Sequence, residues 1–194
     1  MMTVRRYPLA LLSAAALIGG CGSVELRTEV QRIDIANEVF LVLPRADELT
    51  ESFDATQVIS AEYEDENRSF EAHLEARPGR ITIVGLNTIG MVLFSITYDG
   101  TELLASGVAE AHVINARYVL ADVLMSHWDA EWLIPRLEGA TLEVAESSRT
   151  VRRNGDIVIE IGYDSGSSWS GNARLVHHER GYSLRIENVE FAEQ

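Results

Sequence analysis

Five histidines are the side chains of this sequence best suited to bind a metal or to move protons. His73 falls on the polar side of an alternating segment, so we expect it to be solvated. His127 is expected to end a helix, where a positive charge suits the helix dipole. The adjacent His177 and His178 would face opposite ways on a strand and would not chelate one ion together. His112 has no acidic or histidine partner at ligand spacing, so the sequence predicts no metal site and no cofactor.

Two other segments have the composition of reactive or ion-binding loops but not the spacing. Residues 166–171 read Gly-Ser-Ser-Trp-Ser-Gly, which does not give the G-x-S-x-G order of a nucleophile elbow. The acidic run at residues 62–66 lacks the glycine and the ligand spacing of a calcium loop. Both segments are interpreted as surface turns. We therefore expect no enzyme, and a hydrolase with an unrecognised site is the weakest alternative.

The single cysteine, Cys21, is the residue whose position predicts a definite covalent chemistry. Two arginines precede an apolar run over residues 9–20, which has the length of a signal-peptide core and is too short to span a membrane. Leu-Ile-Gly-Gly stands directly before the cysteine. This order resembles the lipobox of bacterial lipoproteins, in which the chain is cleaved before the cysteine and the thiol receives a diacylglycerol. We expect residues 1–20 to be a signal peptide and Cys21 a lipid anchor; a plain secretory signal is the alternative.

The residues after the cysteine and the overall charge narrow the location and the partners. Gly22 and Ser23 follow Cys21, so the aspartate that favours retention in the inner membrane is absent. This favours the outer membrane, with the domain facing the periplasm. The chain has a formal net charge of −14, which disfavours nucleic acid and charge-driven binding to anionic lipid. The membrane partner is therefore expected to be held through the lipid anchor.

The histidines and the two loop segments must be positioned by short strands and tight turns. Residues 69–76 alternate apolar and polar side chains, as a half-buried strand does. Turns are predicted at Pro78-Gly79, Asp99-Gly100 and Asn154-Gly155. The segment over residues 21–50 is treated as a lipidated N-terminal part with a possible first strand, and residues 51–194 as a single domain. The expected strands cover residues 39–43, 69–76, 81–86, 90–98, 101–105, 141–145, 149–153, 156–164, 173–177 and 182–187.

One helical stretch interrupts the strands. Asn115 is a suitable N-cap for a helix over residues 116–127, and a second, shorter helix over residues 130–137 is disturbed by Pro135. Strands on both sides of a helix predict a mainly β fold with helices. We expect a curved antiparallel sheet or a half-open β-barrel, covered by one or two short helices.

The segment Gly90–Tyr98 does not alternate. Met91 and Leu93 are apolar at one parity, and Val92 and Phe94 are apolar at the other. An antiparallel strand with one wet face should alternate. We therefore expect this strand to be covered on both faces, either by helices or because the sheet curls round an apolar cavity.

Several short motifs resemble a known family when they are taken in order. They are Gly79-Arg80-Ile81, Tyr98-Asp99-Gly100, Val119-Leu120-Ala121-Asp122, Leu137-Glu138-Gly139 and the segment from Gly181 to Ile186. With the lipobox, they are similar to a family of proteobacterial lipoproteins catalogued as domain of unknown function 3261. The resemblance covers most of the mature chain. It implies a relation to the lipoprotein carriers LolA and LolB, which are half-open barrels with an apolar cavity for acyl chains. The family has no established catalytic residues to carry over.

The cavity that the resemblance implies would be lined by apolar and aromatic residues of the helices and of one strand. The expected lipid-binding residues are Phe94, Tyr118, Leu124, Met125, Trp128 and Trp132. Trp169, in the loop over residues 166–171, either contacts the membrane or packs over the mouth of the barrel.

The expected function is that of an outer-membrane-anchored lipoprotein that binds or transfers a lipid, acyl or polyene-lipid chain. Its expected partners are a lipid or lipoprotein cargo and a periplasmic carrier protein. The alternative is a non-catalytic structural or assembly lipoprotein that binds a protein partner through its sheet edge or its acidic surface.

Overall fold

The computed structural model describes residues 25–64, 66–107, 115–165 and 171–193. Its strands are β1 (Glu25–Glu29), β2 (Arg32–Ala36), β3 (Val39–Val42), β4 (Phe53–Tyr63), β5 (Glu66–Arg77), β6 (Arg80–Leu86), β7 (Val92–Tyr98), β8 (Glu102–Gly107), β9 (Leu137–Glu138), β10 (Thr141–Ala145), β11 (Ser148–Arg153), β12 (Asp156–Tyr163), β13 (Ala173–His177) and β14 (Tyr182–Glu193). Its helices are α1 (Ala116–His127) and α2 (Ala130–Leu133), with 3-10 turns at Ala46–Glu48 and Ile134–Arg136.

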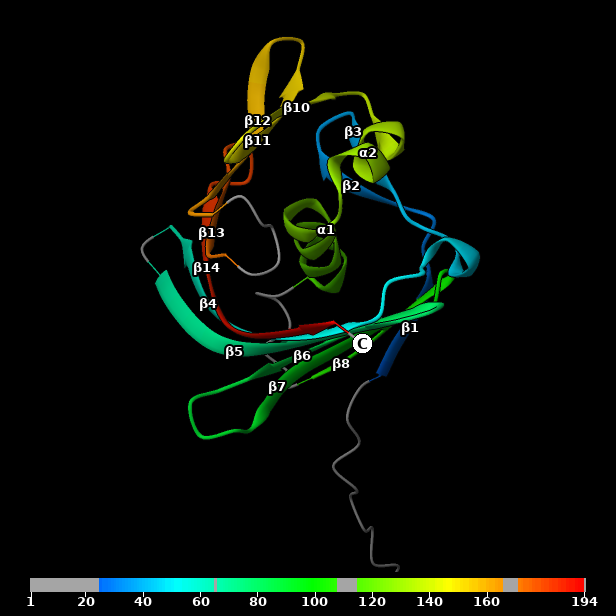
Figure 1. The fold of residues 1–194 in the computed structure, drawn as a ribbon, viewed down its shortest axis with the longest axis vertical. Coiled ribbons are helices and arrows are strands. Elements are labelled where there is room, and N and C mark those ends of the chain that lie inside the picture. Colours follow the sequence, from blue (N-terminus) through cyan, green and yellow to red (C-terminus); the bar gives the residue numbers. More distant parts are fainter. Residues whose placement is uncertain (1–24, 65, 108–114, 166–170, 194) are drawn as a thin grey trace, which may run out of the picture.

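One large antiparallel sheet dominates the fold (Figure 1). It has eleven strands in the order β1-β8-β7-β6-β5-β4-β14-β13-β12-β11-β10. Because β1 and β10 stand at opposite ends of this order, the sheet curves without closing into a barrel. Strands β2, β3 and β9 form a separate three-stranded sheet. The expected mainly β fold, with a curved antiparallel sheet and short helices, is confirmed.

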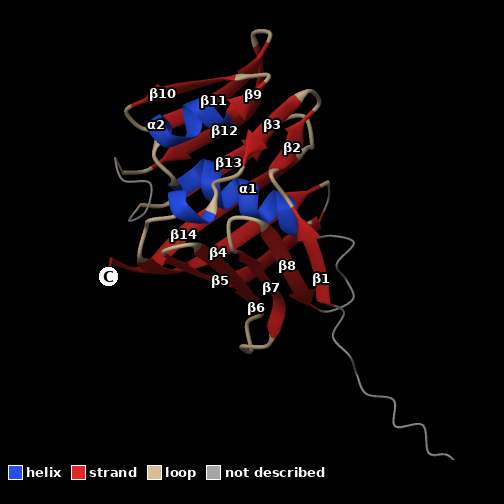
Figure 2. Ribbon diagram, turned by 90° about the vertical axis from the view of Figure 1, so that its right-hand side faces the viewer, coloured by secondary structure: helices blue, strands red, loops and turns tan. Residues whose placement is uncertain are grey.

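The core lies inside the curve of the large sheet. Burial alternates along β4, and the buried residues Phe53, Ala55 and Ile59 point to the same side. The same period of two continues in β5 and β6, so one face of each strand contributes to the core. Helix α1 runs through the concave side of the sheet, and α2 lies beside the small sheet (Figures 1 and 2). Side chains from the sheets and from α1 form one continuous hydrophobic cluster.

The boundaries of α1 follow from local chemistry, as predicted, whereas α2 is shorter than the expected residues 130–137. The Asn115 side chain accepts a hydrogen bond from the Arg117 backbone N–H at 3.0 Å and so caps the first turn of α1. Helix α2 ends at Leu133, and the 3-10 turn that follows contains Pro135. A proline has no backbone N–H, so it fits the start of that turn and not the interior of a longer helix.

The N-terminal segment contributes more strands than the sequence indicated. Residues Val39–Val42 form the third strand and not the first. Strand β1 precedes it and pairs with β8 at the edge of the large sheet. Its sequence, Glu-Leu-Arg-Thr-Glu, is mostly polar because an edge strand with a solvated face needs few apolar residues.

The burial of strand β7 decreases towards the β6–β7 turn. Phe94 and Ile96 are buried and Leu93 is half-buried, whereas Met91 and Val92 are 57% and 52% exposed. The expectation that both faces are covered is therefore wrong for this end of the hairpin. The reason is geometric, because Met91 lies in the turn beyond the last β6–β7 pair, which is Leu86 with Val92.

Candidate functional site

Helix α1 is the element that fills the concave side of the sheet. Leu120 and Leu124 have no exposed surface, and Met125 is 1% exposed. Trp128, which follows the helix directly, is 2% exposed, and its ring packs edge-on against Phe53 of β4 at 5.9 Å. Because the apolar contacts of α1 are with the inner face of the sheet, this helix occupies the space that a half-open barrel would offer to a ligand.

The C-terminal end of α1 is held by a buried arginine of the sheet. The Arg149 guanidinium donates to the Met125 carbonyl at 3.0 Å and to the Trp128 carbonyl at 2.5 Å. The last carbonyls of a helix have no partner within the helix, and they carry its negative dipole end. Arg149 therefore supplies both the missing donors and a complementary charge.

Two further side chains complete the contacts at this end. The Tyr163 hydroxyl donates to the Ser126 carbonyl at 2.7 Å, and burial raises the pKa of Tyr163 to about 12. His127 is the last residue of α1, as predicted, but it is 1% exposed and its Nε2 lies 3.3 Å from Nε2 of Gln57. Arg149 therefore supplies a cation at the helix end, and His127 contributes a buried ring nitrogen that contacts Gln57.

The middle of α1 is joined to the sheet by a carboxyl group. The Tyr182 hydroxyl on β14 donates to Asp122, with distances of 2.8 and 2.9 Å to its two oxygens. Desolvation raises the pKa of Asp122 to about 7, although the Tyr182 hydrogen bond and nearby Arg180 favour the charged form. The carboxyl group thus titrates near neutral pH while it bridges the helix and the sheet.

The N-terminal part of α1 contacts the turn between β13 and β14. The Arg180 guanidinium lies 3.3 Å above the ring of Tyr118 and donates to the Asp34 carbonyl of β2. His177 accepts the Arg180 backbone N–H at Nδ1, at 3.2 Å, and donates from Nε2 to the Ile35 carbonyl at 2.7 Å. Burial lowers the pKa of His177, so its neutral form joins the two sheets.

The predicted lipid-binding residues fall into two environments. Phe94, Leu124, Met125 and Trp128 belong to the buried core. Tyr118 and Trp132 are half-buried at its border. The structure brings Trp128 and Trp132 together, with ring centroids 6.3 Å apart. Phe94 lies elsewhere, beside Phe70, with ring centroids 5.5 Å apart.

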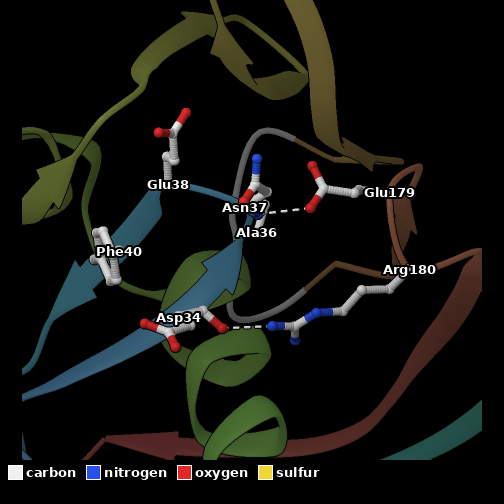
Figure 3. Close-up of a pocket in the computed structure, with 7 residues that line it drawn as sticks. All are labelled: Asp34, Ala36, Asn37, Glu38, Phe40, Glu179 and Arg180. Atoms are coloured by element: carbon white, nitrogen blue, oxygen red, sulfur yellow. Dashed lines mark hydrogen bonds between the residues drawn. The ribbon is translucent and has the colours of Figure 1, made fainter.

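Two open pockets lie outside this core. One, of about 730 Å³, lies between the β2–β3 hairpin and the β13–β14 turn, and Figure 3 shows the residues around it. There the Asn37 backbone N–H donates to Glu179 at 2.6 Å, which lowers the pKa of Glu179. A second pocket, of about 470 Å³, includes Arg32 and Arg117 in its lining. None of the six predicted lipid-binding residues lines either pocket.

Some sequence predictions concern residues outside the described parts of the chain. They are Cys21, His112 and Trp169. Within the described ranges, no group of three or more histidine, cysteine, aspartate or glutamate side chains is placed to hold a metal ion. No helix among the same residues is long and apolar enough to cross a membrane.

The polar residues that hold α1 were not among the site residues predicted from the sequence. The sequence offered a sign that Arg149 is buried, because it lies two residues from buried Val151 on β11 and therefore on the same face of the strand. A charged residue at an apolar parity indicates a specific partner. The sequence offered no such sign for Asp122, Tyr182 and Arg180, since their contact depends on how α1 lies across the sheet.

Comparison with known proteins gives one family and a loose structural likeness. The model of a family described as a protein of unknown function, DUF3261, matches residues 54–190. No curated protein matches the sequence. A LolA-superfamily protein from Nitrosomonas europaea aligns with a TM-score of 0.46 and 10% identity, over 77% of this chain and 90% of that one. A putative outer membrane lipoprotein-sorting protein domain from Vibrio parahaemolyticus aligns with a TM-score of 0.38 and 11% identity, over 77% and 88%.

Proposed function

The chain belongs to the DUF3261 family, and from this premise we propose that it is a non-catalytic, lipid-binding lipoprotein. In this proposal Cys21 carries the lipid anchor and holds the domain at the periplasmic face of the outer membrane. The domain binds an acyl chain, including that of a lipoprotein or a polyene lipid, on the concave side of its sheet. The acyl chain enters by displacing α1.

One observation supports the proposal above all others. Among the described residues, helix α1 provides buried apolar side chains on the concave side of an unclosed sheet. An acyl chain has the same chemistry as these side chains, so it can replace them against Phe53, Phe94 and the other inner residues of the strands. Tyr118, Leu124 and Met125 belong to α1 and move with it in the opened state, so Phe94, Trp128 and Trp132 are the predicted lipid-binding residues that remain to contact the bound acyl chain.

The magnitudes permit this exchange. A chain of about sixteen carbons gains on the order of 12 kcal/mol when it leaves water, at about 0.8 kcal/mol per methylene. Against this stand the lost packing of α1 and its side-chain hydrogen bonds from Arg149, Tyr163 and Tyr182, each with a net contribution of about 1 kcal/mol. A single acyl chain can therefore compensate for much of the cost of opening.

Quenching of Trp128 by a brominated fatty acid tests the proposal. Three tryptophans are present, at 128, 132 and 169, so the double variant Trp132→Phe with Trp169→Phe leaves Trp128 as the sole emitter. We expect saturable quenching that unbrominated fatty acid reverses. The matched control is the same variant titrated with a brominated short-chain acid, which cannot fill the concavity. Unchanged Trp128 emission at saturating long-chain acid would refute the proposed site.

A further inference from the structure

The turn between β6 and β7 exposes more large apolar side chains within a few residues than any other part of the described chain. Ile89 is 77% exposed, Met91 57% and Val92 52%. The other large exposed hydrophobic residues are separated from one another along the sequence. Scattered apolar residues on a surface need no explanation, whereas three within four positions form a continuous apolar tip.

The conformation of this turn is fixed by Asn87. Its side-chain oxygen accepts the backbone N–H groups of Ile89 at 3.1 Å and of Met91 at 2.9 Å. Its own backbone N–H donates to the Met91 carbonyl at 2.9 Å, and Gly90 adopts a φ of +78°, a value that glycine tolerates. The apolar side chains are thus held outward by a preorganised turn, so that binding there requires little ordering of the backbone.

The hairpin also lacks charge. No aspartate, glutamate, lysine or arginine occurs from Ile81 to Tyr98, although the whole chain contains 30 acidic and 16 basic residues. A charged side chain would oppose transfer into a hydrocarbon phase. This end of the protein is therefore compatible with the interior of a bilayer, while the acidic remainder favours water.

The strand register places this tip beside the point where the chain enters the domain. Glu25, the first residue of β1, pairs with Ser106 of β8, and Ser106 pairs with Ser95 of β7. Glu25 thus lies two strands, about 10 Å, from Ser95, and Val92 lies about 10 Å further along β7 towards the tip. Figures 1 and 2 both show the β6–β7 hairpin projecting at the end of the molecule where β1 starts. Cys21 precedes Glu25 by four residues, which span at most about 14 Å.

We propose that the hairpin over residues 86–92 inserts Ile89, Met91 and Val92 into the bilayer to which Cys21 is anchored. This second membrane contact fixes the orientation of the domain, with the β6–β7 hairpin towards the lipid and the β10–β11 hairpin towards the periplasm. The inference rests on the anchor of the proposed function, but it does not require that an acyl chain binds beneath α1.

A fluorescent reporter at the tip tests the insertion. The lipidated protein is purified from membranes as Met91→Cys, labelled with an environment-sensitive thiol probe, and reconstituted into phosphatidylethanolamine and phosphatidylglycerol vesicles that contain doxyl-labelled phosphatidylcholine. Val144→Cys is the matched control, because Val144 is 53% exposed on β10 at the far end of the sheet. The unsubstituted protein is the control for labelling, because acylated Cys21 has no free thiol and should not react with the probe.

We expect the probe at residue 91 to shift to shorter emission wavelength and to be quenched, and the probe at residue 144 to do neither. Adding Ile89→Ser to the residue-91 reporter should lower the ratio of inserted to exposed tip by about tenfold, because one large apolar side chain no longer enters the bilayer. Equal quenching of the two probes on vesicle-bound protein would overturn the insertion and leave the anchor intact.

Two other results would also overturn it. A shift at residue 91 that grows with protein concentration in detergent, without vesicles, would assign the tip to an interface between copies of the chain. Labelling of the unsubstituted protein would show that Cys21 is not acylated and would remove the anchor on which both proposals depend.

Discussion

Replacing Arg149 with methionine should loosen α1 without exposing a new surface. Arg149 is 8% exposed, and its guanidinium donates to two carbonyls at the C-terminal end of the helix. Methionine keeps an unbranched apolar stem of similar reach but has no donor and no charge. The Met125 and Trp128 carbonyls would then be buried without these donors.

The expected cost is about 3 kcal/mol of unfolding free energy. Each buried polar group that loses its partner costs about 1–3 kcal/mol, and the lost interaction with the helix dipole adds about 0.3–1 kcal/mol. If an acyl chain binds by displacing α1, the same contacts are already broken in the bound state. Loss of about 3 kcal/mol from the closed state alone would then raise the affinity for the chain by about a hundredfold.

Two measurements on one protein check this reasoning. Urea unfolding, followed by tryptophan fluorescence, gives the change in stability, and titration with a brominated fatty acid gives the change in affinity. Arg149→Lys is the control, because it keeps the charge with a single ammonium group and should lie between the other two proteins. A stability loss below about 1 kcal/mol would refute the role assigned to Arg149. A large stability loss with unchanged affinity would refute the displacement of α1.

Three further substitutions test separate parts of the account. The pKa of Asp122 is about 7 in the folded protein, whereas its ordinary value is 3.8. The folded state therefore binds the carboxyl proton more tightly than the unfolded state does. Stability should therefore fall between about pH 4 and pH 7, by at most about 1.4 kcal/mol per pH unit, and Asp122→Asn should remove that slope in urea titrations; equal slopes would contradict the assignment. Gly100→Ala should lower the melting temperature by several degrees, because a Cβ there would lie 2.1 Å from the Ala46 nitrogen at a φ of +86°; an unchanged melting temperature would contradict this close approach. Ile89→Ser, at a 77% exposed site, should change unfolding free energy by less than about 0.5 kcal/mol, and a larger loss by urea titration would mean that the tip serves the fold.

The predictable part of the fold is the part that local chemistry determines. The period of two along residues 69–76, the helix over 116–127 and its Asn115 cap were all readable because they depend on near neighbours in the chain. The Asn154-Gly155 turn was readable for the same reason, since both residues adopt the positive φ that they tolerate well.

The rest depends on distant pairing. Strand β9 joins β3 across about a hundred residues, through pairs such as Leu41 with Leu137, and no local pattern indicates that contact. The partners of Arg149 are backbone carbonyls, which every sequence contains. The exposure of the apolar tip could not be predicted because Met91 and Val92 look like core residues. The register shows that Met91 lies beyond the last β6–β7 pair, Leu86 with Val92, and that Val92 precedes the first β7–β8 pair, Phe94 with Gly107.

Native mass spectrometry of the protein extracted from membranes, with its anchor removed by cleavage, tests the central claim most directly. If the concave face binds an acyl chain, a population of the protein should carry a noncovalent adduct with the mass of a lipid or fatty acid. This adduct should be released on collisional activation and should be enriched in Arg149→Met. Bare protein in every charge state, together with no adduct after incubation with fatty acid, would contradict the claim that the concave face binds an acyl chain.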